Sequence, residues 1–380
     1  MRTGGNPARA QRLRILLGQL GKNGDCLYAT ALARQIKQDF PDCHLTWAVG
    51  SPFRDILKGN PFVDEVWEYP MPTAADLENV WPAFAREARA RARRGEFDRV
   101  FLTQVPPDNY ARFDGTVRAS IFRGYPHPVT VPIAPVVRLT EEEVRHAEEF
   151  TTGHAVDVHA HRILFECAGA SRQTFLTPAF ASAAAQLVLA RVPDAIVILT
   201  SNIPVASTDP RIVDASVLTL RENAQLTRHC TLLVGGSSGI TWLATSDWAR
   251  PLPMIQLLSR RTSVFASVLH DAEHFGLPTG NILEMTECEP AHLAECIVAA
   301  LTEGFAEARS RFHERIPVRM DVYLTVFIRS LIRQRRFWTA ARSLWCTLAR
   351  YGPAPLALFL KERLVPPPGH RAAQACFPRT

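Results

Sequence analysis

A loop with three glycines and an aspartate is the first segment of the sequence whose residue types could do chemistry. Residues 17–30 read Leu-Gly-Gln-Leu-Gly-Lys-Asn-Gly-Asp-Cys-Leu-Tyr-Ala-Thr and place Gly18, Gly21 and Gly24 before Asp25. Glycines permit a tight turn and the close approach of a ligand or of another backbone. A carboxylate at the start of a helix is stabilised by free N–H groups, and it can also accept a proton from a hydroxyl.

The spacing of this loop does not decide between those two roles. Gly-x-x-Gly-x-x-Gly differs from the dinucleotide fingerprint Gly-x-Gly-x-x-Gly, and no acid follows at the distance which that fingerprint requires. On spacing alone, the simpler interpretation is that Asp25 caps the helix and Lys22 is solvated.

A second candidate segment is the turn Gly235-Gly-Ser-Ser-Gly239, which follows the apolar run 231–234. A turn of this kind presents backbone N–H groups and hydroxyls at the start of a helix, where a diphosphate can bind. A plain strand-to-helix turn fits the same residues.

The same turn also fits the nucleophile elbow of α/β-hydrolases, Gly235-x-Ser237-x-Gly239. Ser237 would then be the nucleophile, and Asp271 with His274 or His292 would complete the triad. This alternative ranks second, because a hydrolase fold does not require a complete glycine-loop α/β half before the elbow.

The elements that would position these residues alternate along the chain. The first half predicts strands at 14–18, 44–49, 63–67 and 99–103, with helices at 26–40, 53–58 and 74–94; the segment 105–140 is predicted as loops with at most short strands. A helix at 141–150 and a linker at 151–160 follow. The second half predicts strands at 162–166, 195–199, 231–234 and 253–257, with helices at 178–190, 221–228, from 240 onwards and at 291–301. Two doubly wound halves would leave a cleft at the carboxyl ends of their strands.

The first half resembles the heptosyltransferases, glycosyltransferase family 9. The resemblance covers residues 13–67: the pattern Leu-Gly-x-x-Gly-x-x-Gly-Asp-x-Leu-x-Ala-Thr over 17–30, then Phe40-Pro41, then the run from Asn60-Pro61 to Val66. It implies a GT-B-like fold of two Rossmann-like domains facing a cleft. It also implies that Asp25 is the general base, with Gly21, Lys22, Asn23 and Gly24 as the acceptor-side loop.

The resemblance extends to the second turn with two departures. The family reads acid-Ser/Thr-Gly-x-x-His-Leu-Ala there, and Ser238, Gly239, Leu243 and Ala244 match it. Ser237 stands at the place of the acid, and Trp242 stands at the place of the histidine. The identity of the donor therefore stays open, and a relative without activity also remains an alternative. The donor-binding residues implied by the resemblance are Arg172, Gly236, Ser237, Ser238, Gly239 and Thr241. Arg172 would face the diphosphate.

Metal chemistry is not favoured by the sequence. His154, Asp157, His159 and His161 crowd the linker, but no acid-rich motif accompanies them. No Asp-x-Asp occurs, although transferases that hold Mg²⁺ on a nucleotide diphosphate commonly use one. We expect no metal and no cofactor, with N–H groups and Arg172 in place of the ion.

Composition sets the remaining expectations. The 380 residues carry a net charge of +6 and lack an uncharged apolar stretch long enough to span a membrane, so we expect a cytoplasmic protein. The predicted parts are a disordered basic arm (1–12), an acceptor-side domain (13–152), a nucleotide-sugar domain (160–315), a basic helical extension (316–365) and a disordered tail (366–380). Residues 319–363 either bind an anionic membrane surface, as a peripheral protein on the inner face, or pack as a helical hairpin. No nucleic-acid-reading module is recognised.

Taken together, the sequence predicts an inverting, metal-independent glycosyltransferase. Its donor would be a nucleotide-sugar, and its acceptor a glycan or lipid-linked glycan in the synthesis of a surface polysaccharide. A serine hydrolase and a sugar-nucleotide-binding relative without activity remain the alternatives.

Overall fold

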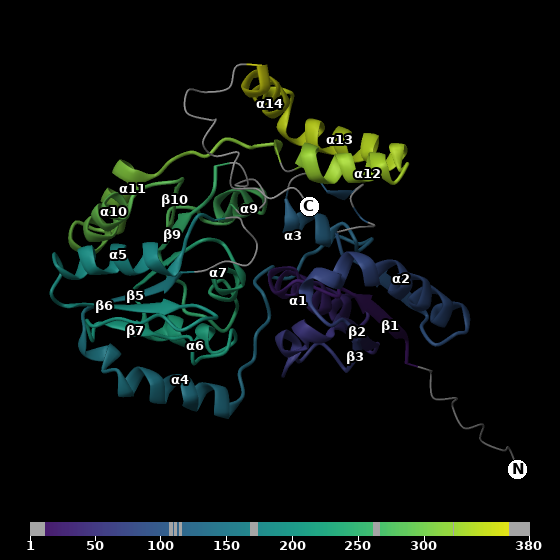
Figure 1. Cartoon of the computed structure of the whole chain (residues 1–380). Coiled ribbons are helices and arrows are strands. Elements are labelled where there is room, and N and C mark those ends of the chain that lie inside the picture. The colour runs from purple at the N-terminus through teal and green to yellow at the C-terminus, as the bar shows by residue number, and fades with distance from the viewer. Residues whose placement is uncertain are drawn as a thin grey trace, which may run out of the picture.

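The computed structural model describes residues 12–105, 109, 112–113, 116–167, 174–260, 267–321 and 323–364. The predictions for residues 1–11, for Arg172 and for the tail 366–380 lie outside the described residues. Two α/β halves lie side by side, and the C-terminal helices lie above them in Figure 1. In the described part of the chain, no helix is both long and apolar enough to cross a membrane.

The first half contains a parallel sheet with the strand order β3-β2-β1-β4. Its strands are β1 (Arg14–Gly18), β2 (His44–Gly50), β3 (Glu65–Tyr69) and β4 (Arg99–Leu102). Its helices are α1 (Asn23–Asp39), the 3-10 helices η1 (Ser51–Leu57) and η2 (Ala74–Asp76), α2 (Leu77–Arg93) and α3 (Val117–Phe122). The centre of the sheet is β1, whose residues Ile15, Leu16 and Leu17 are fully buried. Burial on both faces is expected of a strand in a parallel sheet covered by helices.

The second half repeats this plan in a larger parallel sheet, with the order β10-β9-β8-β5-β6-β7. Its strands are β5 (His161–Glu166), β6 (Ala195–Thr200), β7 (Ile212–Asp214), β8 (Leu232–Gly235), β9 (Met254–Leu257) and β10 (Ile282–Met285). Its helices are α5 (Pro178–Leu189), α6 (Asn223–His229), α7 (Gly239–Leu243), α9 (Val268–His274), α10 (Pro290–Thr302) and α11 (Phe305–Phe312). The predicted doubly wound architecture is confirmed in both halves.

The strand orders place both candidate segments where ligands usually bind in such sheets. The order reverses between β1 and β4 in the first sheet and between β5 and β8 in the second. The glycine loop follows β1, and the turn 235–239 follows β8. A reversal of this kind opens a crevice at the carboxyl ends of the strands, which is the usual ligand position in open α/β sheets.

The connecting helix α4 (Glu141–Gly153) begins at a complete capping box formed by Thr140 and Glu143. A short 3-10 helix, η4 (Val156–Val158), follows it. Along its length, α4 packs on α6 of the second half, where His229 lies 3.1 Å from Glu148. The chain thus reaches the second half before its sheet begins.

The C-terminal helices return to the first half. They are the π-helical segment η5 (Tyr323–Ile328), α12 (Arg329–Arg333), α13 (Phe337–Tyr351) and α14 (Ala354–Leu364). The hydroxyls of Tyr323 and Ser343 lie 2.6 Å apart, and Ser343 donates to the carbonyl of Phe113 at 3.2 Å. The predicted helical extension is therefore present, and these buried contacts attach it to the first half.

The prediction that 105–140 holds only loops and short strands is wrong at α3. This helix has six residues and carries Arg118, which is only 4% exposed. A buried arginine interrupts the apolar pattern by which a helix face is recognised. The strands β7 and β10 escaped prediction because runs of three and four residues give too little periodicity.

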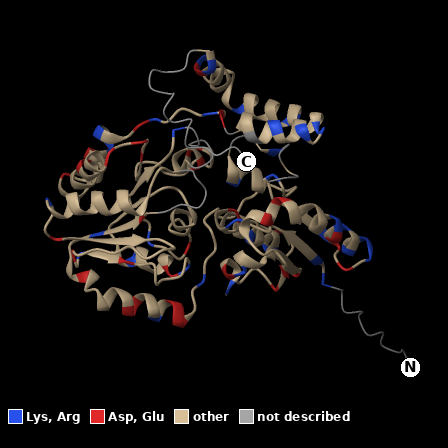
Figure 2. Ribbon diagram, viewed as in Figure 1, with Lys and Arg blue, Asp and Glu red and all other residues tan. Residues whose placement is uncertain are grey.

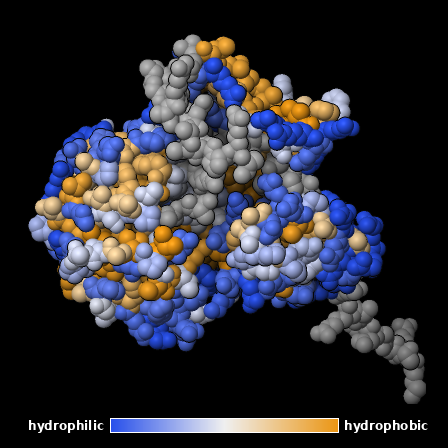
Figure 3. Space-filling view, in the orientation of Figure 1, coloured by the Kyte–Doolittle hydropathy of each residue, from blue (hydrophilic) through white to orange (hydrophobic). Residues whose placement is uncertain are grey.

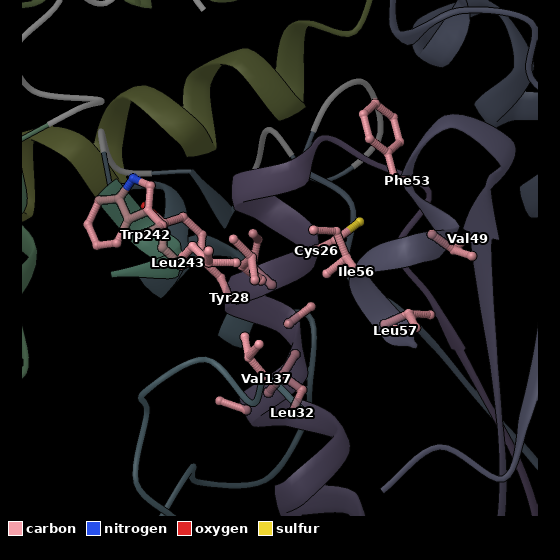
Figure 4. Close-up of a cluster of buried hydrophobic side chains, with 14 of the residues drawn as sticks. Cys26, Tyr28, Leu32, Val49, Phe53, Ile56, Leu57, Val137, Trp242 and Leu243 are labelled. Atoms are coloured by element: carbon pink, nitrogen blue, oxygen red, sulfur yellow. The ribbon is translucent and has the colours of Figure 1, made fainter. Parts of the chain in front are cut away.

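The two halves share one buried apolar cluster. It includes Leu27 and Tyr28 of α1 together with Trp242 and Leu243 of α7 (Figure 4). The cleft expected from the sequence is therefore interrupted, because α1 and α7 pack directly against each other.

Candidate active site between the two halves

The glycine loop is shaped by close packing at two of its three glycines. A Cβ atom built on Gly18 would lie 2.7 Å from Cδ2 of Leu102, and one on Gly21 would lie 2.3 Å from the ring of Phe53. Real Cβ atoms essentially never approach so closely, so a side chain at either position would force a neighbouring side chain to move. At Gly24 the nearest atom is Cδ1 of Trp242 at 3.6 Å, an ordinary contact.

Asp25 lies in the first turn of α1, and Lys22 is the N-cap residue. The helix begins three residues before the predicted start at Cys26, and its N-cap residue makes no side-chain capping hydrogen bond. Burial raises the pKa of Asp25 to about 6, although the charge and N–H of Lys22 and the amide of Gln104 lower it. A carboxylate with a pKa near neutrality is suited to taking a proton at physiological pH.

A buried amide network holds the loop beneath Asp25. Gln19 donates to the carbonyl of Gly21 at 3.0 Å and to Oε1 of Gln104 at 2.8 Å. Gln104 Oε1 also accepts from the N–H of Gly21 at 3.1 Å. Thr103 completes the network by donating to Gln19 Oε1 at 2.8 Å. Gln104 was not among the predicted site residues, although polar residues directly after a predicted strand were a signal.

The turn of the second half is organised around a carboxylate that the sequence analysis also missed. Glu166, the last residue of β5, is 1% exposed. Its Oε2 accepts from the hydroxyl of Thr241 at 2.7 Å, from the N–H of Gly236 at 3.2 Å and from that of Ser238 at 3.5 Å. Burial raises the pKa of Glu166 to about 7, although these three donors lower it.

Glycine at position 235 makes room for this carboxylate. A Cβ atom built on Gly235 would lie 2.6 Å from Oε2 of Glu166. Two N–H groups that the sequence assigned to a diphosphate therefore donate to Glu166. Ser238 and Gly239 are partly exposed at the tip of the turn, whereas Gly236, Ser237 and Thr241 are buried. The other oxygen of Glu166, Oε1, is buried without a partner.

The glycine loop and the turn meet across the two halves. A Cβ atom built on Gly239 would lie 3.5 Å from Cβ of Asn23. The structure thus brings the predicted acceptor-side loop and the predicted donor-binding turn into direct contact, with Asp25 two residues beyond Asn23 on α1.

Below this contact lies a cavity of about 560 Å³ between the halves. Its lining includes Asn23 and η1 from the first half, and α4 with residues 219–222 from the second. Arg221 pairs with Glu143 at 2.7 Å in its wall. Desolvation raises the pKa of Glu143, but hydrogen bonds from Arg221 and from the N–H of Thr140, together with the charges of Arg221 and Lys58, outweigh that effect and bring it to about 2. A cavity of this size can hold a small organic ligand.

Of the residues suggested for a serine-hydrolase triad, Asp271, His274 and His292 contact side chains outside that triad. Ser237 is 2% exposed with a φ of 60°. Asp271, the acid of that triad, pairs with Arg118 of the first half at 2.7 Å. His274 packs edge-on against Phe275, and His292 packs against Phe312. Asp271 is thus committed to a contact between the halves.

The histidines of the linker have separate partners. His159 lies 3.7 Å from Asp194, His154 packs on Phe150, and Asp157 lies 2.9 Å from His229. Across the residues that the structure describes, no three His, Cys, Asp or Glu side chains are grouped to hold a metal ion.

Neither a protein-family model nor a curated protein matches the sequence. Solved structures do match the fold. The crystal structure of a glycosyl transferase family 9 protein from Veillonella parvula shares 17% identity at a TM-score of 0.52, over 79% of this chain and 94% of its own. The E. coli ADP-heptose LPS heptosyltransferase II shares 14% identity at a TM-score of 0.50, over 77% of this chain and 99% of its own.

These similarities define the class of fold. The chain has the GT-B architecture of two Rossmann-like halves, and the resemblance to glycosyltransferase family 9 is confirmed at the level of the fold. Both similar structures are covered almost completely by this chain.

Proposed function

We propose that this protein is a glycosyltransferase that moves a sugar from a nucleotide-sugar to an acceptor hydroxyl by direct displacement. Asp25 takes the proton of the acceptor hydroxyl as its oxygen attacks the anomeric carbon. The bond between that carbon and the diphosphate oxygen breaks, and the nucleoside diphosphate leaves. The reaction inverts the anomeric centre and needs no metal ion.

The proposal depends mainly on the ionisation of Asp25 and on its position. Its pKa of about 6 leaves it mostly ionised at neutral pH and still basic enough to accept a proton. It lies in the first turn of α1, next to the contact of Asn23 with Gly239. The first turn of α1 is thus adjacent to the turn that we propose to hold the donor.

The donor side is proposed to use the tip of the turn and the carboxylate behind it. Ser238 and Gly239 are the partly exposed residues there, and Glu166 fixes the turn from the sheet side. Glu166 also restores a carboxylate to a turn that has Ser237 at the place of the family's acid. Because its Oε1 has no partner, Glu166 is suited to accept a hydrogen bond from a sugar hydroxyl.

The acceptor is proposed to be a glycan or a lipid-linked glycan in the synthesis of a surface polysaccharide. ADP-heptose is not assumed as the donor, because Ser237 and Trp242 replace the acid and the histidine of the family pattern. Arg172 is proposed as a partner of the diphosphate.

The test is a thermal-shift screen with nucleoside diphosphates and their sugar conjugates in the presence of EDTA. A ligand at a hundredfold excess over its Kd adds about 2.7 kcal/mol to the free energy of unfolding, which raises the melting temperature by a few degrees. Gly239→Val should abolish the shift, because the added side chain would occupy the space between residue 239 and Asn23. Gly280→Val is the control, because a Cβ atom there meets nothing within 4 Å.

Turnover then tests the base. Acceptor-dependent release of nucleotide should fall by about 10²–10⁴-fold in Asp25→Asn. It should persist in Asp194→Asn, whose side chain is 63% exposed and remote from the turn. If Asp25→Asn transferred the sugar at nearly the wild-type rate, Asp25 would not be the general base. Binding of a nucleotide-sugar without any acceptor-dependent release would identify a binding protein instead.

A further inference from the structure

The helix α13 turns its largest aromatic side chains outward. Trp338 is 90% exposed and Trp345 is 72% exposed, whereas Ala340, Ser343 and Thr347 are buried. Residues advance by about 100° around a helix, so Trp338 and Trp345 point within about 20° of each other. The buried residues lie on the opposite side. The side that packs on the protein is thus made of small residues, and the apolar bulk faces outward.

The neighbouring helices extend this outward apolar surface. Ile332 of α12 is 48% exposed and Leu364 of α14 is 82% exposed, and Phe337 at the start of α13 is 60% exposed. Figure 3 shows the apolar patch over the C-terminal helices at the top of the molecule. Isolated exposed apolar residues need no explanation, but a contiguous group on adjoining helices marks a docking surface.

Arginines surround these apolar side chains. Arg329, Arg333, Arg335 and Arg342 are exposed on α12, on α13 and between them. The only acid between residues 329 and 364 is Glu362, and it forms an ion pair with Arg319. The ribbon in Figure 2 marks basic residues along α12 and α13. The surface is therefore both aromatic and positively charged.

We infer that the exposed face of α12–α14 docks on an anionic membrane surface. Tryptophan is favoured at the boundary between lipid headgroups and acyl chains, and arginine binds the headgroup phosphates. A protein partner of complementary charge would account for the arginines, but it would not require two nearly uncovered tryptophans on the same side. The inference does not depend on the proposed transfer reaction.

The contacts of the C-terminal helices also determine which half of the protein would lie next to the membrane. Tyr323 and Ser343 bind the extension to the first half through Phe113. The half attached to the membrane is thus the one that contains Asp25 and the acceptor-side loop. A lipid-linked acceptor would approach this half from the same surface.

The test is co-sedimentation of the full chain with vesicles of phosphatidylcholine, alone or with about one third phosphatidylglycerol. We expect binding to the anionic vesicles only, weakened by added salt because exposed charges are screened. The double variant Trp338→Ala/Trp345→Ala should bind at least about tenfold more weakly. Each of Arg333→Gln and Arg335→Gln should weaken binding by about fivefold.

Two controls separate this effect from misfolding. Val158→Ser removes an apolar side chain that is 74% exposed on another part of the surface, and it should bind as the wild type does. All variants should keep the melting temperature of the wild type, because the changed side chains are exposed. Anionic vesicles should also shift the tryptophan emission to shorter wavelength in the wild type, but not in the double variant.

Three outcomes would overturn the inference. The wild type could fail to bind anionic vesicles, or the double variant could bind them as well as the wild type. In the third outcome neither protein binds vesicles and the wild type is a dimer that the double variant dissociates, which would make this face a contact between two copies. The vesicle assay uses no donor or acceptor, so its result is independent of the transferase proposal.

Discussion

Trp242 of α7 packs edge-on against Tyr28 of α1, with ring centroids 4.6 Å apart and ring planes at 74°. The guanidinium carbon of Arg118 lies 5.0 Å from the ring centroid of Tyr28 and 5.1 Å from that of Trp242. The two halves are therefore joined by two rings in edge-on contact and a buried cation, beside the first turn of α1 that carries Asp25. Trp242 stands at the place of a histidine in the family pattern, so here that position serves the packing of the halves.

The first prediction concerns this joint. Trp242→Ala should lower the free energy of unfolding by about 3–5 kcal/mol, because it removes a buried aromatic side chain and leaves a cavity. Trp242→Phe should lose less, since a ring remains against Tyr28. Urea unfolding measures both values. Trp338→Ala is the matched control, because the same residue type is 90% exposed there. Equal stability of the two alanine variants would contradict the packing described here.

The second prediction is a pH profile. With a pKa of about 6 for Asp25, kcat/KM should rise about tenfold per pH unit below 6 and level off above it. Lys22→Gln removes a charge that lowers this pKa, so the acidic limb should move to higher pH. Lys361→Gln should leave the limb in place. A limb that stays unchanged in Lys22→Gln would argue that another group titrates.

The same shift has a consequence for stability. The pKa of Asp25 rises from 3.8 to about 6 on folding, so the folded state binds the proton more tightly than the unfolded chain. Stability should therefore fall as the pH rises from about 4 to 6. Asp25→Asn should lack this part of the loss of stability, and it should be more stable than the wild type at neutral pH although its turnover is strongly reduced.

The third prediction concerns Glu166. Its pKa rises from 4.5 to about 7 on folding, so its ionisation should reduce stability as the pH rises through that window. Glu166→Gln should flatten this dependence in thermal unfolding followed at several pH values. In Glu166→Ala, the N–H of Gly236 and the hydroxyl of Thr241 lose their acceptor, at a cost of about 1–3 kcal/mol.

Binding measurements with the same variant test the proposed role of Glu166. Glu166→Gln should bind the nucleoside diphosphate nearly as well as the wild type and the nucleotide-sugar about tenfold more weakly, since a bond to the sugar is affected. An equal loss for both ligands would indicate that Glu166 only shapes the turn.

Local sequence signals predicted the order of the strands, turns and helices well. The glycine loop, the turn 235–239 and most strands were visible because their signals are glycine spacing and apolar runs. The two doubly wound halves followed from the alternation of strands and helices, and the resemblance to the family implied their GT-B arrangement. The starts of helices were less certain, since α1 begins at Asn23 before its apolar pattern does.

The tertiary contacts that position the site residues could not be predicted from local sequence signals. Glu166 ends an apolar strand, and its role depends on the missing side chain of Gly235 in a neighbouring strand. Arg118 has a residue type that is mostly exposed, but α1, α7 and α9 enclose it together. Both effects arise from tertiary packing between segments far apart in the sequence.

The last prediction separates the glycines of the loop by their surroundings. Gly21→Ala should destabilise the protein by at least about 1–3 kcal/mol, because the new Cβ atom would lie 2.3 Å from the ring of Phe53. Gly24→Ala should be neutral or stabilising by up to about 1 kcal/mol, because Gly24 lies in the first turn of α1 and the nearest atom is at 3.6 Å. Chemical denaturation of the two variants measures the difference. If Gly24→Ala were the more damaging change, the contact between α1 and Trp242 would be tighter than the contact between the loop and Phe53.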